Sequence, residues 1–214
     1  MTTGHAQIDR STLAEKLVPL AQKNTRTIVA FAGGPGAGKS TLVEALLAEI
    51  ETNAPGAAAI LPMDGYHYDD LYLEPNGLRP RKGAPETFDV GGLRTTLARL
   101  RADNESRVAV PVFDRSIEIA RAGARLILPQ HRLILVEGNY LLLEQDPWTD
   151  LREMFDMTVF VDVPLDILRA RLTERWSDLP AEEARRKVDE NDLPNARYVA
   201  DNSTTADFTI MNHG

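Results

Sequence analysis

The segment Gly33–Ser40 constrains this chain more than any other part of it. It reads G-G-P-G-A-G-K-S and matches the pattern G-x-x-x-x-G-K-S/T of a phosphate-binding P-loop. Residues 27–32 before it are apolar and partly β-branched, as in a buried parallel strand, and residues 41–49 after it carry leucine and valine at helical spacing. The required order of strand, loop and helix is therefore met. The alternative, an ordinary glycine-rich turn, gives no reason for Gly-Lys-Ser to open a helix.

The residue types in this loop explain how it would hold phosphate. Glycines leave successive backbone N–H groups free to point inward, and the start of the following helix adds positive potential. Lys39 would hold the β- and γ-phosphates, the Ser40 hydroxyl would ligate Mg²⁺ and Thr41 would reach the α-phosphate. The predicted nucleotide-binding residues are Gly33, Gly34, Pro35, Gly36, Ala37, Gly38, Lys39, Ser40 and Thr41.

Composition restricts the partners of this site. The chain has 214 residues, of which 43% are hydrophobic and 26% charged, and it contains no internal linker, so we expect one domain over residues 1–214. A formal net charge of −8 opposes a nucleic-acid surface and favours a small-molecule partner. No apolar stretch reaches membrane-span length and residues 1–10 do not resemble a signal peptide, so we expect a cytoplasmic protein without a membrane partner. The oligomeric state stays open, a homodimer included.

Cysteine and histidine usage excludes two kinds of site. The chain has no cysteine, which rules out disulfides, thiolate metal sites and cysteine nucleophiles. Its four histidines, one of which is His5, do not pair at metal-ligand spacing, so we expect no zinc site.

Strand-like and helix-like segments alternate along the chain, which predicts an α/β fold with a doubly wound, mainly parallel sheet. Thr12 and Glu15 have the spacing of a capping box at the start of the first helix, and Asp89 would cap another. Two short strands around a polar turn predict a β-hairpin insertion. The expected helices are 12–22, 41–49, 90–100 and 165–176, the expected sheet strands are 27–32, 58–62, 133–136, 158–161 and 207–210, which closes the sheet, and the hairpin strands are 108–112 and 125–128.

Acidic residues follow three of the predicted strands. Ligands of such sheets lie beyond the carboxyl ends of the strands, which gives weight to Asp64, Glu137 and Asp162. Glu137 stands where an acid would hold Mg²⁺, or where it would cap a turn. Asp64 would accept the proton of an attacking hydroxyl, or would bond its own backbone in a turn. Asp162 caps the next helix or takes part in the chemistry.

The helix expected at residues 165–176 would form part of a lid over residues 165–190. Arg171 and Arg175 are four residues apart and share a face, so they either close over the transferred phosphoryl group or pair with Glu174 and Asp178 in solvent. The apolar stripe of this helix is expected at Leu165, Leu168, Leu172 and Trp176.

Five segments together resemble one superfamily. Beside the P-loop they are M-D-G-Y-H at 63–67, R-K-G-A-P-E-T-F-D at 81–89, P-V-F-D-R at 111–115 and L-I-L-V-E-G-N-Y-L-L at 133–142. In combination the chain resembles P-loop small-molecule kinases of the uridine kinase, phosphoribulokinase and bacterial pantothenate kinase superfamily. Its second and third motifs are most similar to the pantothenate kinases and to small bacterial, fructokinase-like kinases of fructose transport systems.

The resemblance implies roles at the matching positions. It makes Asp64 the catalytic base, places Glu137 by the metal, and favours Arg171 and Arg175 as lid arginines, although the choice between Arg169 and Arg171 stays open. The acceptor would contact residues of the second to fourth motifs, namely Tyr66, His67, Arg81, Lys82, Glu86, Asp114 and Arg115.

The resemblance leaves the acceptor open. The chain is shorter than bacterial pantothenate kinases and lacks the histidine and arginine that uridine kinases show after P-V-F-D-R. The sequence therefore predicts ATP- and Mg²⁺-dependent transfer of a γ-phosphoryl group to a hydroxyl of a small metabolite, with a sugar or polyol as the leading acceptor and a nucleoside or pantothenate-like molecule as the alternative. A regulatory NTPase switch is a further alternative, although the guanine-reading N-K-x-D element is absent. A nonenzymatic ATP-binding module is the third.

Overall fold

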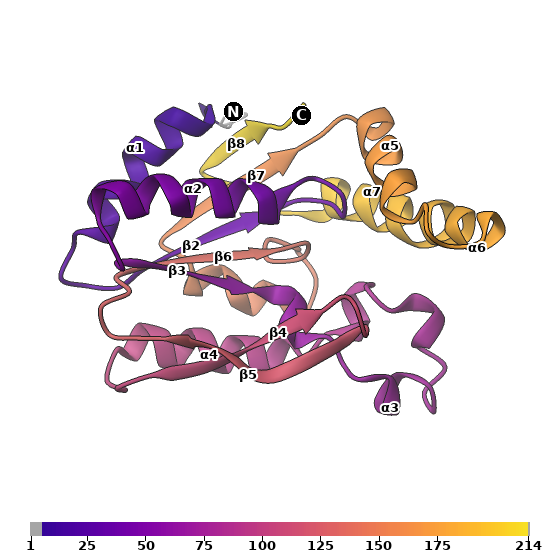
Figure 1. Cartoon of the computed structure of the whole chain (residues 1–214), viewed down its shortest axis with the longest axis horizontal. Coiled ribbons are helices and arrows are strands. Elements are labelled where there is room, and N and C mark those ends of the chain that lie inside the picture. The colour runs from indigo at the N-terminus through magenta and orange to yellow at the C-terminus, as the bar shows by residue number, and fades with distance from the viewer. Residues whose placement is uncertain (1–5, 214) are drawn as a thin grey trace.

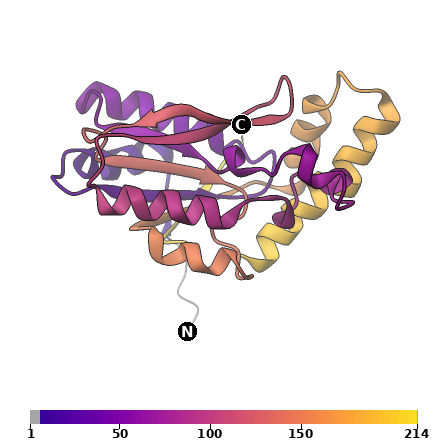
Figure 2. The same ribbon diagram turned by 90° about the horizontal axis from the view of Figure 1, so that it is seen from below.

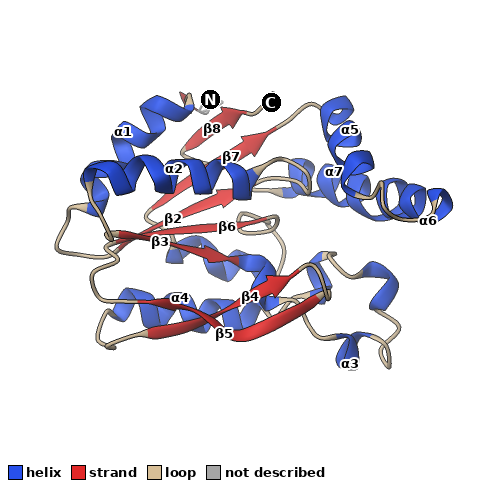
Figure 3. Cartoon of the chain, viewed as in Figure 1, coloured by secondary structure: helices blue, strands red, loops and turns tan. Residues whose placement is uncertain are grey.

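The alternation of side chains along the central strands sets the layers of the molecule. In β2 (Thr27–Ala32) every residue is buried, with Ile28, Ala30 and Ala32 facing one core and Val29 and Phe31 facing the other. Successive side chains of a strand point to opposite faces, so an uninterrupted apolar strand needs cover on both sides. The computed structural model, which describes residues 6–213, supplies that cover with helices above and below one sheet (Figures 1 and 3).

The sheet has six parallel strands in the order β1-β8-β7-β2-β6-β3. This is the predicted α/β doubly wound fold. Its strands are β1 (Ala6–Gln7), β2, β3 (Ala58–Pro62), β6 (Leu133–Gly138), β7 (Met157–Asp162) and β8 (Phe208–Met211). The α-helices are α1 (Arg10–Ala21), α2 (Lys39–Asn53), α3 (Asp70–Leu73), α4 (Val90–Ala102), α5 (Leu165–Arg175), α6 (Ala181–Arg186) and α7 (Leu193–Asn202).

Strand register brings the acidic residues to one edge of the sheet. Glu137 on β6 pairs with Phe31 on one side and with Pro62 on the other. A short 3₁₀ turn, Met63–Tyr66, follows Pro62 at once and carries Asp64. The P-loop, Glu137 and Asp64 therefore lie side by side at the carboxyl ends of three adjacent strands.

Helices cover the two faces of the sheet unequally. Buried residues of α1, α2 and α5 form one core with the upper face, and α4 forms the other core with the lower face. The segment from α5 to α7 lies beyond the arrowheads of the strands in Figure 1, and Figure 2 shows it at the same end of the molecule as the segment around α3. We call residues 165–192 the lid segment. It ends in a π-helical stretch, Lys187–Asp192.

The predicted hairpin is present, with a longer second strand than expected. Strand β4 (Val108–Asp114) pairs antiparallel with β5 (Ile119–Ile127), and a register shift falls between Val110 and Val112. The expectation of a strand at 125–128 was too short because most of β5 is exposed or half-buried and carries no apolar pattern. Pairing with β4, rather than burial, makes this segment a strand.

Other boundary predictions were wrong in detail. Asp9 caps α1 by accepting a hydrogen bond from the Thr12 backbone N–H at 2.8 Å, so Thr12 is inside the helix. The Asp162 side chain caps nothing, because Pro164 holds the cap position of α5. Leu165 is 46% exposed and lies outside the apolar stripe. Strand β8 lies inside the sheet, because β1 pairs on its outer side.

Among the described residues, no helix is both long enough and apolar enough to cross a lipid bilayer. His5 lies outside the described residues.

Gly138, which follows Glu137, lies where there is no room for a side chain. A Cβ added at Gly138 would lie 2.4 Å from Met63 Cβ and 2.6 Å from its sulfur. We therefore expect Gly138→Ala to push Met63 and the adjacent Asp64 out of place, with a loss of about 1–3 kcal/mol in the free energy of unfolding. Urea unfolding measures this loss. Gly91→Ala is the matched control, because Gly91 is exposed in α4 and an added Cβ there would lie 3.6 Å from Asp89 Oδ1, which is ordinary van der Waals contact. A Gly138→Ala variant as stable and as active as the wild type would contradict this packing.

Candidate active site

The P-loop begins α2 with its glycines in the conformations that the motif requires. Gly38 has φ +80° and ψ 24° and holds the cap position of α2, with no side chain to satisfy the first backbone N–H groups. Those N–H groups remain available to an anion at the start of the helix. The loop closes on itself through a hydrogen bond from the Ala37 N–H to the Gly34 carbonyl at 3.1 Å.

Lys39 is the buried cation of the loop, with only 6% of its surface exposed. Its Nζ donates to the Gly34 carbonyl at 2.9 Å and to Asn139 Oδ1 at 2.7 Å. Burial lowers the pKa of Lys39 to about 8, although Glu137 and Asp64 act in the opposite direction. Neutral acceptors hold the ammonium in place without cancelling its charge, which leaves the charge free to attract phosphate.

Ser40 and Glu137 form an oxygen-rich pair next to Lys39. Ser40 Oγ donates to Glu137 Oε2 at 3.2 Å. Burial, and then the neighbouring Asp64, raise the pKa of Glu137, while Lys39 opposes the rise. Hard oxygen ligands of this kind suit Mg²⁺, which takes one or two protein ligands together with phosphates and waters. Among residues 6–213 no group of three or more histidine, aspartate or glutamate side chains lies close enough together to hold a metal ion.

Asp64 lies across the cavity from the P-loop. Its carboxylate accepts a hydrogen bond from Arg115 Nη2 at 2.5 Å. Burial opposes ionisation, but His67, Arg115 and Lys39 together outweigh it and lower the pKa of Asp64. His67 Nδ1 lies 2.7 Å from the Asp64 carbonyl and must donate to it, while its ring packs between Phe88 and Phe113. A partly buried carboxylate that stays ionised can accept a proton from a hydroxyl.

The lid segment brings its arginines to the same cavity. Arg171 donates to the Gly36 carbonyl at 3.5 Å and to the Asn212 carbonyl at 3.2 Å, and Arg175 also lines the cavity. Neither of them pairs with Glu174 or Asp178. Arg169 instead pairs with Asp189 at 2.5 Å and stays outside the cavity, so Arg171 is the residue of the two that faces the P-loop.

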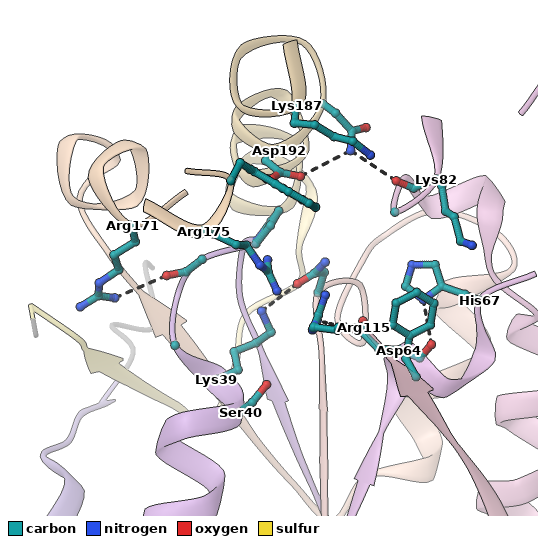
Figure 4. Close-up of a pocket in the computed structure, with 18 of the residues that line it drawn as sticks. Lys39, Ser40, Asp64, His67, Lys82, Arg115, Arg171, Arg175, Lys187 and Asp192 are labelled. Atoms are coloured by element: carbon teal, nitrogen blue, oxygen red, sulfur yellow. Dashed lines mark hydrogen bonds and ion pairs between the residues drawn. The ribbon is translucent and has the colours of Figure 1, made fainter. Parts of the chain in front are cut away.

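All these groups line one cavity of about 410 Å³ at the carboxyl ends of the strands. Figure 4 shows the P-loop side chains rising from α2, the lid cations above them and the acceptor-side residues opposite. From the sequence-predicted residues the structure brings together Pro35, Gly36, Gly38, Lys39, Ser40, Thr41, Asp64, His67, Lys82, Arg115, Glu137, Arg171 and Arg175.

Several predicted acceptor contacts do not reach this cavity. Tyr66 is buried in the core below the sheet, and burial raises its pKa to about 12. Arg81 and Glu86 pair with each other near the surface. Asp114 accepts hydrogen bonds from Ser116 and Arg121. Motif letters alone do not say on which side of a 3₁₀ turn or a hairpin a side chain lies.

The structure adds cavity residues that sequence reasoning missed. Asn139 follows the V-E-G motif and was predictable as a partner of the P-loop lysine, since it comes just after a strand end. Gly83 belongs to the motif at 81–89, and the rest depend on the path of the hairpin and of the lid segment, which no short pattern gives. They are Phe113, Glu118, Trp176, Lys187, Asn191 and Asp192.

Comparison with known proteins places this site in a family. No family model matches the chain. It is 33% identical over 209 residues to a protein of Schizosaccharomyces pombe named "putative uridine kinase", covering 93% of this chain and 88% of that protein. A crystal structure titled "putative fructose transport system kinase", from Silicibacter sp. TM1040, superposes with a TM-score of 0.85 and is 39% identical, covering 94% of this chain and 98% of that one.

The chain belongs to the P-loop kinases of the uridine kinase, phosphoribulokinase and pantothenate kinase superfamily. A pantothenate kinase of Streptomyces coelicolor is 30% identical over 165 residues, but this chain spans only 48% of its length. The shared family supports a small-molecule kinase in general. It does not choose among acceptors, because the names of the relatives differ.

The pH dependence of nucleotide binding tests the role of Lys39 in this kinase. The protonated lysine attracts phosphate, and with a pKa of about 8 it loses its proton in the empty site as the pH rises through that value. The affinity for Mg-ADP should therefore fall about tenfold between pH 7 and pH 9. Calorimetric titration measures this affinity. The Lys39→Arg variant, whose cation stays charged, should bind with no such dependence, and a flat wild-type profile would contradict the assignment.

Proposed function

We propose that this protein transfers the γ-phosphoryl group of ATP to a hydroxyl of a small metabolite. The convergence of Lys39, the Ser40–Glu137 pair and Asp64 on one cavity carries this proposal. Lys39 and the Ser40–Glu137 pair suit the polyphosphate of a nucleotide and its metal ion. Asp64 is a carboxylate that nucleotide binding alone does not require. A nucleotide switch would need Lys39 and the Ser40–Glu137 pair, but it would not need a general base at Asp64.

The P-loop would hold the nucleotide through backbone N–H groups and Lys39. Because Lys39 already has neutral partners on two sides, its ammonium is oriented before the nucleotide arrives. Arg171, anchored on the Gly36 carbonyl, ties the lid segment to the loop, and Arg175 extends into the cavity beside it. Positive groups fixed around the transferred phosphoryl are the main source of rate in such enzymes.

Ser40 and Glu137 are the residues that would hold Mg²⁺, and they fit it by donor chemistry. Both offer oxygen, they lie 3.2 Å apart, and the carboxylate is buried with the hydroxyl as its hydrogen-bond partner. When bound, the ion would neutralise charge on the nucleotide phosphates.

Asp64 would act as the general base. The ion pair with Arg115 orients the carboxylate, and its lowered pKa keeps it ionised at neutral pH. It would accept the proton of the acceptor hydroxyl as the oxygen attacks the γ-phosphorus and the bond to the leaving oxygen of ADP breaks. Burial lowers the pKa of His67, and the hydrogen bond from its Nδ1 to the Asp64 carbonyl supports the turn that carries the base.

The acceptor would occupy the part of the cavity between Asp64, Lys82 and the hairpin. Both donors and acceptors line the cavity, with Lys82 and Asn191 among the donors and Glu118 and Asp192 among the acceptors. A polar, uncharged molecule with several hydroxyls suits this mixture, and a sugar or polyol is our leading proposal. A nucleoside is the alternative, since Phe113 offers an aromatic face.

Replacing Asp64 tests the assignment of the base. Asp64→Asn keeps the size of the side chain and removes its basicity, so turnover should fall by about 10² or more while Mg-ADP binding stays close to that of the wild type. Steady-state kinetics and calorimetry give the two quantities. Asp162→Asn is the matched control, because Asp162 also ends a parallel strand but does not line the cavity. Unchanged turnover in Asp64→Asn would remove Asp64 from this role.

A further inference from the structure

Trp176 stands at the centre of the lid segment, directly after α5. It lines the cavity, and its indole Nε1 donates to Asp192 Oδ2 at 2.7 Å. A tryptophan with its single donor bonded has its ring orientation fixed by that bond and by packing. Trp176 is therefore a rigid surface within the lid segment.

The π-helical stretch Lys187–Asp192 determines where the Asp192 side chain lies. Hydrogen bonds in a π-helix join residues five apart, so the first and last residues of this stretch lie one above the other. In an α-helix the same separation would place them on different faces. Single π-turns inside helices are rare and often occur at functional sites. Here the stretch turns Lys187 and Asp192 together toward Trp176.

Two cations pack on the Trp176 ring. Lys187 Nζ lies 5.1 Å from the ring centroid and the Arg175 guanidinium carbon lies 5.9 Å from it. Cations within about 6 Å of an aromatic ring are attracted to it without losing their charge. The ring thus holds both side chains in the cavity while leaving them able to bind an anion.

The other cations that line the cavity have partners in the protein. Lys82 pairs with Asp70 and Arg115 pairs with Asp64. Lys39 and Arg171 donate to oxygen atoms of the chain. Over residues 6–213 no acidic side chain forms an ion pair with Arg175 or Lys187, although both act electrostatically on Asp192. Like the ammonium of Lys39, these two cations can therefore attract an anion bound in the cavity.

We propose that Trp176, fixed by Asp192, holds Arg175 and Lys187 against the phosphates of the bound nucleotide, which makes Lys187 a further phosphate ligand and Asp192 a positioning residue. This inference rests on the proposed function. The phosphates are the anion in question because Arg175 and Lys187 line the same cavity as the P-loop and Asp64, between which the transferred phosphoryl group would lie. Lys187 shares the ring with Arg175 and faces the same space.

The buried state of Asp192 supports a positioning role. Only 7% of its surface is exposed, and burial raises its pKa. Keeping the carboxylate ionised in this position therefore costs free energy. Its partners are the indole of Trp176, and at 3.4 Å the amide of Asn191, which also donates to the Lys82 carbonyl. The same carboxylate therefore fixes the ring and joins the lid segment to the acceptor side.

The test measures binding of Mg-AMPPNP to the full chain by calorimetry, together with turnover. Lys187→Met should weaken binding about tenfold and lower turnover, and Lys187→Arg should restore most of both. Arg186→Met is the matched control, since Arg186 is exposed, adjacent and outside the cavity, and it should behave as the wild type.

Asp192 is tested by two variants. Asp192→Asn keeps an oxygen for the indole N–H and should retain most of the affinity, whereas Asp192→Leu should lose about as much as Lys187→Met and should change the Trp176 emission before nucleotide is added. A purely structural role would lower the unfolding temperature of both variants and leave the nucleotide affinity of the folded protein unchanged.

The outcomes separate this inference from the proposed function. Wild-type affinity in both Lys187→Met and Asp192→Leu would overturn the inference alone. A Lys187→Met variant whose KM rises only for the acceptor would overturn it too, because the lysine would then serve the acceptor. Failure of the wild-type protein to bind Mg-AMPPNP would overturn the inference and the proposed function together.

Discussion

Parallel pairing of β6 between β2 and β3 is the constraint on which the site depends. It places the P-loop after one strand, Glu137 at the end of the next and Asp64 in the turn after the third. Each of these strands is apolar and covered on both faces, so the polar groups can lie only where the strands end. A shift of one residue in either pairing would turn Glu137 into one of the two cores.

Burial and charge act against each other throughout the cavity. Burial lowers the pKa of Lys39 and raises that of Glu137, as expected for isolated charges, while cations around Asp64 reverse the effect of burial and keep it ionised. The protein environment therefore shifts the pKa values of these three neighbouring groups in different ways: those of Lys39 and Asp64 are lowered and that of Glu137 is raised. Such separation of pKa values is typical of sites where one group must hold charge and another must take a proton.

The sequence predicted most of what lies on strands and at their ends, and less of what depends on loops. Strand β2, the P-loop, Asp64 and Glu137 were predictable because apolar runs and strand ends determine where such residues lie. Tyr66 and Asp114 do not line the cavity, because the direction of a side chain in a turn depends on packing, here on α4 and on Arg121. Trp176 was predicted as part of an apolar stripe, and its position on the cavity wall beside the π-helical stretch was not predicted.

The most direct test of the central claim is Mg-ATP turnover by the purified protein against sugars, polyols, nucleosides, pantothenate and a cell metabolite extract, with mass spectrometry of the products. The account predicts one class of acceptor that gains a single phosphoryl group, with ADP formed in equal amount and with product formation lost in Asp64→Asn. Acceptor-independent hydrolysis of ATP with no phosphorylated metabolite, even in the extract, would contradict the account and favour a nucleotide switch.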